Sequence, residues 1–500
     1  NLYNGCYYKK IRDLSSSSDI LIVNHSMLVS YYDKYDTFIN DESVCIIDEC
    51  HNFHSICQKQ LSTTVDINLF NDQKKSFISI VDSIKREKSD FSIANSVTGI
   101  KNKYSEFINL FESLCVDFHQ FNSTASMQSE YIQNIMFSEK NNLINFKDSI
   151  TFLISKYDDV IKEILNFKDL LDTNDFKRNS VQAVDLLLKS LENTAMILDG
   201  LNENNRDKIH WFSFRNMNRT LDKMSFNSAP SNLQGISKDI FEKFSSIILC
   251  SATLCTDSGF DFFVRQMGLK DQVYSDIVKL KKYPSPYYYS DQSKLFIINS
   301  SLELNLQAHI KRVAADILDI SRRTNKRILV LCTSFKQIYE FESCINSSID
   351  KNDRFLYQKK GISKNILISE YLNNKSSVLF GTNTFWEGVD FPNDKLEILI
   401  LFKLPFANPQ DPYVNANIKY YESRNMDPFS KYQLEDTILK LKQGFGRLIR
   451  SYSDMGVCII TDPRIAKRRY GQYIVDSLPV EPTYYSSSGI LVEEISNFLK

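Results

Sequence analysis

Short apolar runs rich in β-branched residues recur in both flanks of the chain and limit its fold more than any other feature. Each run precedes a helical pattern, and nearly every run ends in small or polar residues. The runs are Ile20–Val23, Val44–Ile47, Ile247–Leu249, Ile328–Leu331, Val378–Phe380, Ile398–Leu401 and Val457–Ile460. Buried strands that alternate with helices predict an α/β fold with parallel sheets. Such sheets bind ligands at the carboxyl ends of their strands, so the residues after each run are the candidates for chemistry.

The stretch between the flanks, residues 100–200, has a different pattern. Apolar residues recur there at steps of three and four, in the two series Tyr104, Phe107, Phe111, Leu114, Phe118, Phe121 and Val184, Leu188, Leu191, Ala195, Leu198. This spacing predicts helices with one buried face. The stretch carries no chemical motif, so we predict a helical insertion.

Composition narrows the class of protein. A chain of 500 residues that is 43% hydrophobic can bury roughly two or three cores. The formal net charge is -1, so a nucleic-acid partner requires a local basic track. Cysteines inside apolar runs indicate a reducing compartment, and we expect a cytoplasmic protein. No run approaches the roughly 18 apolar residues of a membrane span, and no signal peptide opens the chain.

The first motif is Val44–His51, which reads V-C-I-I-D-E-C-H. An apolar strand followed by two carboxylates is typical of a Walker B site, where Asp48 would hold Mg²⁺ beside a triphosphate. Glu49 would then take a proton from the attacking water. His51 completes a D-E-x-H box. A zinc site is the alternative, and its candidate ligands are Cys50, His51, His54 and Cys57.

Two further motifs follow apolar runs. Ile247–Leu254 reads I-I-L-C-S-A-T-L, and its hydroxyl groups suit a hydrogen-bonded link between two sites. Val378–Asp390 reads V-L-F-G-T-N-T-F-W-E-G-V-D, and its glycines allow backbone amides to approach a ligand. Phe385 and Trp386 would stack on nucleic-acid bases, at about 1–3 kcal/mol per base. Packing in the core is the alternative for these two aromatic rings.

The fourth motif is Leu441–Arg450, which reads L-K-Q-G-F-G-R-L-I-R. On one helix, Gln443, Arg447 and Arg450 would share a face. Two guanidiniums and an amide suit a phosphoryl group in transit, and such arginines raise rates by about 10³–10⁵. Structural salt bridges are the alternative, but glycines inside a helix are costly and require a reason such as close approach to a ligand.

A phosphate-binding loop of the form G-x-x-x-x-G-K-[ST] does not occur in the sequence. A Walker B site requires such a loop, which is expected before it in the chain. We therefore expect that the sequence, which begins at Asn1, is cut at its N-terminus. We also expect negligible ATP hydrolysis from this segment alone.

In their order along the chain and in their sequences, these motifs resemble those of superfamily 2 helicases of the DinG/XPD group, and in particular its bacterial DinG branch. The resemblance covers residues 1–60 and 216–485. The matching segments are Asn24–Leu28, the D-E-C-H box, Ser251–Leu254, Trp386–Asp390, Lys403–Phe406, Pro409–Pro412, Gln443–Arg450, Tyr470-Gly471 and Ser477–Pro479. It implies two RecA-like parallel-sheet motor domains with a helical, Arch-like insertion.

The resemblance also implies domain boundaries and an activity. Residues 1–62 and 216–270 would form motor domain 1, residues 63–215 the insertion, and residues 271–500 motor domain 2. The implied activity is ATP-dependent DNA unwinding with 5′→3′ polarity, in DNA repair. The expected partner is single-stranded or forked DNA, with no membrane, and the expected state is monomeric.

The resemblance assigns roles at the nucleotide. Asp48 would bind Mg²⁺, and Glu49 would activate water. Arg447 and Arg450 would reach the γ-phosphate of ATP, with Gln443 beside the water.

The resemblance also assigns residues to coupling and to DNA. Hydrolysis would be coupled to DNA binding by His51, Ser251 and Thr253. Nucleotide and DNA contacts would be linked by Glu387, Gly388 and Asp390. The DNA would be touched by Thr333, Ser334 and Trp386.

An iron–sulfur cluster is one open point. Many relatives hold a 4Fe–4S cluster on four cysteines, and Cys6 resembles the last of these without the proline that usually follows. Its partners would lie upstream, or Cys6 is an unligated relic. A helicase fused to an exonuclease, and a DNA-binding remnant without ATPase activity, are the alternative functions.

Overall fold

The structure is a computed structural model. It describes residues 7–15, 17–30, 42–87, 91–122, 132–136, 146–173, 176, 178–200, 208–217, 220–231, 233–300, 306–346, 354–374, 376–382, 385 and 396–500. The contacts divide the chain into two compact units. The first unit comprises Asn1–Ser43, Asn52–Ser245 and Pro409–Tyr420, and the second comprises Val44–His51, Ser246–Asn408 and Tyr421–Lys500.

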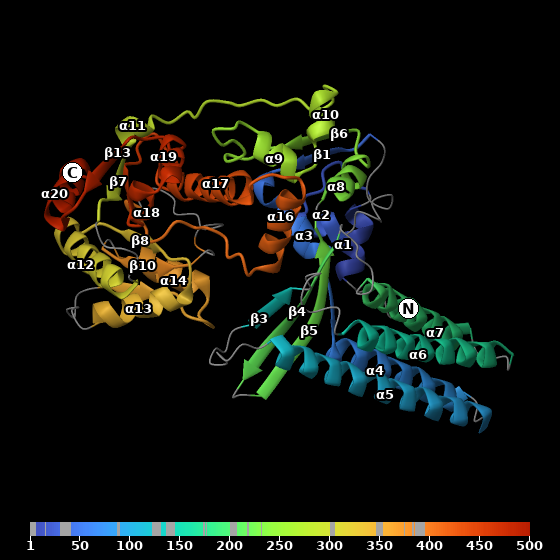
Figure 1. Ribbon diagram of the computed structural model, residues 1–500. Helices are drawn as coiled ribbons and strands as arrows, with labels where there is room; N and C mark the ends of the chain where they lie inside the picture. Colours follow the sequence, from blue (N-terminus) through green and yellow to red (C-terminus); the bar gives the residue numbers. More distant parts are fainter. Residues whose placement is uncertain are drawn as a thin grey trace. The chain divides into compact units, whose positions relative to one another are not determined.

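A seven-stranded parallel sheet forms the centre of the second unit (Figure 1). In sheet order its strands are β13 (Pro482–Tyr485), β7 (Ser293–Ile298), β12 (Gly456–Ile460), β11 (Ile398–Leu401), β8 (Ile328–Leu331), β10 (Val378–Gly381) and β9 (Phe355–Tyr357). Strands β8, β10, β11 and β12 are buried along their whole length, which explains their continuous apolar runs. The predicted strands in these four runs are confirmed.

Helices cover both faces of this sheet. Side chains alternate between the two faces along each strand, so each strand contributes to two separate cores. Ile328 and Val330 of β8 belong to one core cluster, whereas Leu329 and Leu331 belong to the other. The first cluster includes residues of α12 (Leu306–Thr324), α13 (Phe335–Asn346) and α20 (Ser488–Phe498). The second includes residues of α14 (Lys364–Leu372), α17 (Leu434–Phe445) and α19 (Arg469–Asp476).

A second parallel sheet in the same unit pairs β1 (Val44–Ile47) with β6 (Ser246–Leu249). Both strands fall on predicted apolar runs, and Ile47 stands opposite Leu249. The predicted α/β fold class is confirmed by the parallel sheets. Strands β7, β9 and β13 were not predicted, and of these β9 and β13 are the outer strands of the large sheet. An outer strand is covered less completely, so its sequence lacks a long apolar run.

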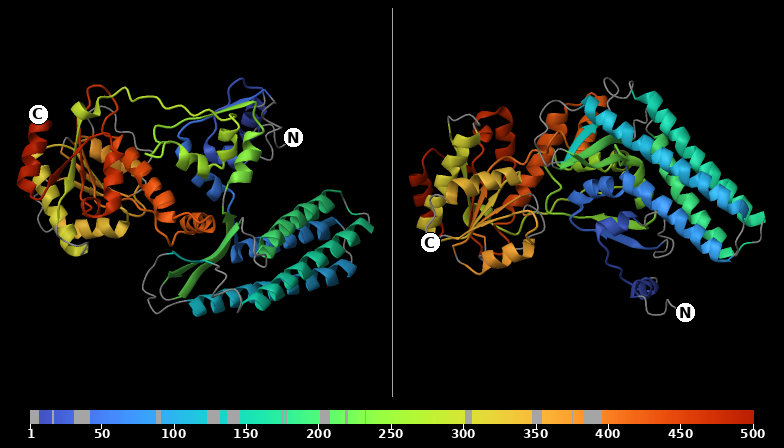
Figure 2. Two further views of the ribbon diagram at one scale, coloured as in Figure 1. Left: turned by 45° about the horizontal axis from the view of Figure 1, so that its top comes forward. Right: turned by 90° about the horizontal axis from the view of Figure 1, so that it is seen from below.

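Long helices build most of the first unit, and they run alongside one another (Figures 1 and 2). They are α4 (Ile67–Glu87), α5 (Phe91–Asn122), α6 (Lys147–Thr173) and α7 (Arg178–Asp199). Aromatic rings fill the space between them, with the ring centroids of Phe70 and Phe107 4.6 Å apart. Phe107 also lies 4.8 Å from Tyr157 between ring centroids. The predicted helices in residues 100–200 are therefore confirmed.

The prediction of a purely helical insertion over 63–215 is wrong in part. The first unit also contains an antiparallel sheet in the order β2 (Thr63–Asp66), β5 (Thr220–Pro230), β4 (Lys208–Met217) and β3 (Ile132–Met136). β4 and β5 extend beyond the predicted boundary at residue 215. Trp211 and Phe212, neighbours on β4, are both buried, so β4 is covered on both faces and lacks the alternation of a half-buried strand.

The predicted strand at Ile20–Val23 is also wrong. These residues have no regular secondary structure, and Ile20 and Ile22 are 80% and 91% exposed. A strand requires a hydrogen-bonding neighbour, and none of the described residues pairs with this run. The helix α2 (His25–Ser30) starts directly afterwards, and the Asn24 side chain accepts a hydrogen bond from the Met27 amide at 2.7 Å.

Shorter helices complete the described part of the chain. They are α1 (Tyr7–Ser15), the 3₁₀ helix η2 (Cys50–Asn52), α3 (Phe53–Gln60), α8 (Gln234–Phe241), α9 (Asp261–Gln266), α10 (Lys270–Tyr274), α11 (Tyr289–Gln292), α16 (Pro412–Ser423), the π-helix η3 (Phe429–Gln433) and α18 (Arg464–Lys467). None of the helices in the described ranges has the length and apolar character required to span a bilayer.

Candidate nucleotide-hydrolysis site

The carboxyl ends of β1 and β6 bring two of the predicted motifs together. Pairing continues past the strands, because the Cys250 amide donates to the Ile47 carbonyl at 3.0 Å. The Cys50 amide donates in turn to the Cys250 carbonyl at 3.1 Å. The D-E-C-H box and the S-A-T segment therefore leave the sheet side by side, as expected for parallel strands.

Glu49 has an unusual backbone conformation in this turn. Its φ of 49° lies in the left-handed region, which costs a residue other than glycine roughly 1–2 kcal/mol. The Glu49 amide donates to Oδ1 of Asp48 at 2.9 Å, which offsets part of this cost. The Glu49 side chain is 62% exposed, so its carboxylate is open to solvent at the end of the strand.

Glu49, His51 and Ser251 form a triangle of polar contacts. The Ser251 hydroxyl donates to Oε2 of Glu49 at 3.0 Å, and it lies 2.7 Å from Nδ1 of His51. Nδ1 of His51 is also 3.2 Å from Oε2 of Glu49. Because the Ser251 hydroxyl hydrogen points to Glu49, the serine oxygen can accept a hydrogen bond from Nδ1–H of His51. The predicted coupling residues His51 and Ser251 thus both contact the predicted catalytic carboxylate.

Thr253 extends this arrangement to α17. Its amide donates to the Ser251 hydroxyl at 3.3 Å, and its own Oγ1 accepts a hydrogen bond from Nε2 of Gln443 at 3.1 Å. Thr253 is 8% exposed, so solvent competes little for this bond. A continuous path of hydrogen bonds therefore runs from Glu49 through Ser251 and Thr253 to Gln443. The sequence predicted all four residues but not the contact between Thr253 and Gln443.

The prediction that Gln443, Arg447 and Arg450 share one helical face is wrong. α17 ends at Phe445, so both arginines lie in the turn and loop that follow it. The Arg447 amide bonds to the Gly444 carbonyl at 3.2 Å, a tightening from the i−4 to the i−3 carbonyl that closes the helix. Gly444 and the next glycine, Gly446, favour an ending here, because glycine has low helix propensity.

The loop around Arg450 is held by buried polar groups that the sequence analysis missed. Oδ2 of Asp454, a residue only 7% exposed, accepts the amides of Arg450 at 2.7 Å and Ser451 at 2.8 Å. Nε2 of Gln292 donates to the Ser451 and Asp454 carbonyls at 2.9 and 3.0 Å, and the Tyr287 hydroxyl donates to the Arg450 carbonyl at 2.6 Å. These contacts fix the backbone that carries Arg450.

The two predicted arginines differ in exposure, since Arg447 is buried and Arg450 is half-buried. Arg447 is 8% exposed. Burial lowers the pKa of Arg450, an effect that the nearby Asp454 carboxylate opposes. Both guanidiniums belong to a segment that precedes β12, whereas Asp48 and Ser251 follow their strands. Contact of the two arginines with the carboxylates at 48 and 49 stays a prediction.

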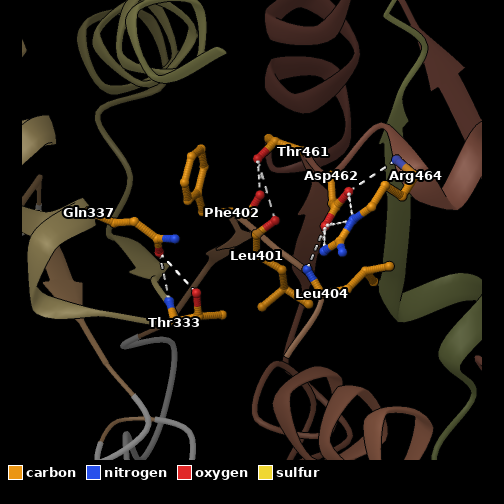
Figure 3. A network of polar contacts seen from close by, with 8 residues as sticks. All are labelled: Thr333, Gln337, Leu401, Phe402, Leu404, Thr461, Asp462 and Arg464. Atoms are coloured by element: carbon orange, nitrogen blue, oxygen red, sulfur yellow. Dashed lines mark hydrogen bonds and ion pairs between the residues drawn. The ribbon is translucent and has the colours of Figure 1, made fainter. Parts of the chain in front are cut away.

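Thr333 and Ser334 follow β8, at the carboxyl edge of the large sheet (Figure 3). The amide and hydroxyl of Thr333 donate to Oε1 of Gln337 at 2.9 and 3.2 Å. The Ser334 hydroxyl accepts the Gln337 amide at 3.4 Å, at the start of α13. At the same edge, Asp462 is fully buried and pairs with Arg464. The predicted contact of Thr333 and Ser334 with DNA is a matter for experiment.

Several predicted residues lie outside the described part of the chain. They are Cys6, Trp386, Glu387, Gly388 and Asp390. Phe385 is described and fully buried, so of the two interpretations of its ring, base stacking is wrong and core packing is confirmed. A Cβ atom on Gly381 would lie 2.6 Å from this ring, so glycine is required there for close packing.

Among the residues that the structure describes, no group of three or more His, Cys, Asp or Glu side chains is placed to hold a metal ion. In particular, His51 contacts Ser251 and Glu49 rather than a set of cysteines. Asp48 is exposed directly after β1, and its hard carboxylate oxygens suit Mg²⁺.

Comparison with known proteins finds two family models that match segments of this chain. Residues 2–69 match the DEAD_2 family, and residues 317–481 match the family described as the helicase C-terminal domain. The first match includes the D-E-C-H box, and the second includes Gln443, Arg447 and Arg450. The chain therefore belongs to the XPD/DinG family of helicases.

Particular relatives match nearly the whole chain. The ATP-dependent DNA helicase YoaA of Escherichia coli is 26% identical over 491 residues, which cover 96% of this chain and 70% of that protein. The 3′-5′ exonuclease DinG of Bacillus subtilis is 23% identical over 529 residues, covering 95% of this chain and 53% of that protein. The solved structure of Xpd4 from S. tokodaii aligns over 95% of this chain and 80% of that chain, at 14% identity and a TM-score of 0.49.

Proposed function

We propose that this chain is the motor of an ATP-dependent DNA helicase that moves 5′→3′ along single-stranded DNA. Family membership supports a helicase, and the similarity to the ATP-dependent DNA helicases YoaA of Escherichia coli and Haemophilus influenzae supports ATP as the fuel and DNA as the substrate. The scattered free thiols of the described cysteines are consistent with action in a reducing cytoplasm.

Glu49 is the proposed general base. It accepts a proton from a water molecule whose oxygen attacks the γ-phosphorus of ATP. The bond from that phosphorus to the bridging oxygen breaks, and ADP leaves. Gln443 orients the water, and the positive charges of Arg447 and Arg450 stabilise the transferring group.

Asp48 is the proposed magnesium ligand. Mg²⁺ bound to its carboxylate would neutralise charge on the β- and γ-phosphates. Asp48 also accepts the Glu49 amide, so the same carboxylate fixes the turn that carries the proposed base.

The path of hydrogen bonds from Glu49 to Gln443 is the observation that supports the proposal most. It joins the proposed base, the proposed water-orienting amide and the S-A-T segment in one network. A change at the γ-phosphate that moves the Gln443 side chain would therefore also move Thr253, which accepts its hydrogen bond. In the proposal, Thr333, Ser334, Trp386 and the segment 387–390 carry this change to the DNA backbone.

Strand displacement with the full-length gene product tests the proposal. A duplex with a 5′ single-stranded tail and a matched duplex with a 3′ tail are compared, each with ATP and with a non-hydrolysable analogue. We expect unwinding of the 5′-tailed duplex only, and only with ATP. DNA binding without DNA-stimulated hydrolysis would support the alternative of a DNA-binding remnant.

A helicase fused to a nuclease is the second candidate function, favoured by the similarity to the 3′-5′ exonuclease DinG of Bacillus subtilis. Degradation of a 3′-labelled strand by the full-length gene product, persisting in a Glu49→Gln variant, would support it. Loss of nuclease and helicase activity together in that variant would argue against a separate nuclease.

A further inference from the structure

The segment 253–258 contacts α17 through three hydrogen bonds that involve side chains. Gln443 Nε2 donates to Thr253 Oγ1 at 3.1 Å, and Lys442 Nζ donates to the Cys255 carbonyl at 3.0 Å. Two turns earlier on the helix, Oε1 of Glu435 accepts a hydrogen bond from the Ser258 hydroxyl at 3.1 Å. One helix thus holds both ends of the segment 253–258.

The docked segment is also stabilised from within. Thr256 and Gly259 exchange amide-to-carbonyl hydrogen bonds of 3.0 Å in both directions. The hydroxyls of Thr256 and Ser258 lie 2.8 Å apart. Gly259 has a φ of 70°, which glycine adopts without strain, so it closes this turn. A segment built in this way moves as one piece, and its position depends on where α17 holds it.

Lys442 is the charged member of the three contacts. It is half-buried, and burial lowers its pKa, while the nearby Asp257 carboxylate acts in the opposite direction. A hydrogen bond from an ammonium group to a carbonyl is stronger than one between neutral groups. Lys442 also directly precedes Gln443 in the chain, so a shift of Lys442 displaces the neighbouring amide.

We infer that Lys442 is a positioning residue for ATP hydrolysis. It fastens α17 to the Cys255 carbonyl and thereby sets Gln443 against Thr253. This inference rests on the proposed function, because Gln443 is its proposed point of action. Lys442 itself need not touch the nucleotide. Its effect is on the rate of the chemical step, with little effect on the binding of ATP.

A double-mutant cycle in the full-length gene product tests this role. Lys442→Met should lower kcat for DNA-stimulated ATP hydrolysis about tenfold and leave the KM for ATP within about twofold, because one charge-assisted contact is lost. In a Gln443→Ala background, Lys442→Met should cause no further loss. Lys442→Arg, which keeps a charged donor, should retain most of the activity.

Lys440→Met is the matched control. Lys440 lies on the same helix, and its Nζ pairs with Asp436 at 2.7 Å, one turn away on α17. Its replacement should leave kcat unchanged. Equal losses in both variants, or a full tenfold loss from Lys442→Met on top of Gln443→Ala, would overturn the inference.

Amide hydrogen exchange separates a failure of the inference from a failure of the proposed function. The amides of Thr256 and Gly259 should exchange faster in Lys442→Met and at the wild-type rate in Lys440→Met. This readout does not require ATP hydrolysis. Unchanged exchange in Lys442→Met would overturn the inference even if the wild type hydrolyses ATP. Absent hydrolysis in the wild type, with faster exchange in Lys442→Met, would overturn the proposed function and leave only the fastening of the segment by Lys442.

Discussion

Gln443 and Thr253 stand 190 positions apart in the sequence, and Nε2 of the first donates to Oγ1 of the second at 3.1 Å. Thr253 also donates its amide to Ser251, which itself donates to Glu49. The amide on α17 therefore shares one hydrogen-bond network with the proposed general base. This network defines where hydrolysis and its coupling should be disrupted by mutation.

Thr253→Val tests the link between the S-A-T segment and α17. Valine keeps the volume of threonine but removes the acceptor for Gln443. We expect kcat for DNA-stimulated ATP hydrolysis to fall about tenfold, since one buried hydrogen bond is lost. Thr437→Val is the control, because the hydroxyl of Thr437 donates to the carbonyl of Gln433, the residue directly before α17. Equal kcat values for the two variants would contradict the link.

Asp454→Ala tests the loop that carries Arg450. Three donors of the described residues Arg450 and Ser451 lose their common acceptor, and burial leaves them little access to water. We expect a loss of about 2–4 kcal/mol in the free energy of unfolding, measured by urea denaturation. Asp476→Ala, at an exposed position, should change that free energy by less than about 0.5 kcal/mol.

Gly381→Ala tests the packing after β10. The added Cβ atom would lie 2.6 Å from the buried ring of Phe385, and so the ring or the strand must shift. Overpacking of this kind costs about 1–3 kcal/mol in the free energy of unfolding. The control is Gly235→Ala, where nothing lies within 4 Å of the added atom. A Gly381→Ala protein as stable as the wild type would show that the close approach is absent.

Two histidines of the first unit, the buried His54 and the half-buried His210, predict a dependence of stability on pH. Burial lowers the pKa of His54 and of His210 to about 4, from 6.5. Above pH 6.5 both are neutral whether the chain is folded or unfolded, so their contribution is fully present. As pH falls from 6.5 towards 4, the unfolded chain takes up protons that the folded chain excludes, at about 1.4 kcal/mol per histidine and pH unit.

Asp316 of the second unit has the opposite effect on the dependence of stability on pH. Burial raises its pKa to about 6, so its contribution is present below pH 3.8 and is lost as pH rises through 6. The unfolding midpoint should therefore fall less steeply between pH 6.5 and 4 in His210→Phe than in the wild type. In Asp316→Asn the same fall should be steeper. Parallel curves for all three proteins would contradict both assignments.

Four strands of the large sheet could be predicted because burial on both faces leaves a clear mark in the sequence. β8, β10, β11 and β12 all fall on apolar runs. The edge strand β13 and the doubly covered β4 carry no such mark, and both were missed. The run Ile20–Val23 is apolar but unpaired among the described residues, which shows that composition alone does not make a strand.

The site could be predicted as a set of residues but not as a geometry. Asp48, Glu49, Ser251 and Thr253 are recognisable because each follows a strand. The loop conformation around Arg450 depends on contacts of Asp454 and Gln292 that no spacing in the sequence reveals. The contact of Gln443 with Thr253 depends on tertiary packing, for the same reason.

The carboxylate of Glu49 and the guanidinium of Arg450 are proposed to act on one nucleotide. Single-turnover hydrolysis of ATP by the full-length gene product tests this proposal. In Glu49→Gln we expect ATP binding close to that of the wild type, with hydrolysis at least about 10²-fold slower, since the general base is lost. In Arg450→Ala we expect hydrolysis slowed about 10³-fold in a folded protein. Wild-type rates of hydrolysis in both variants would contradict the proposed roles of Glu49 and Arg450.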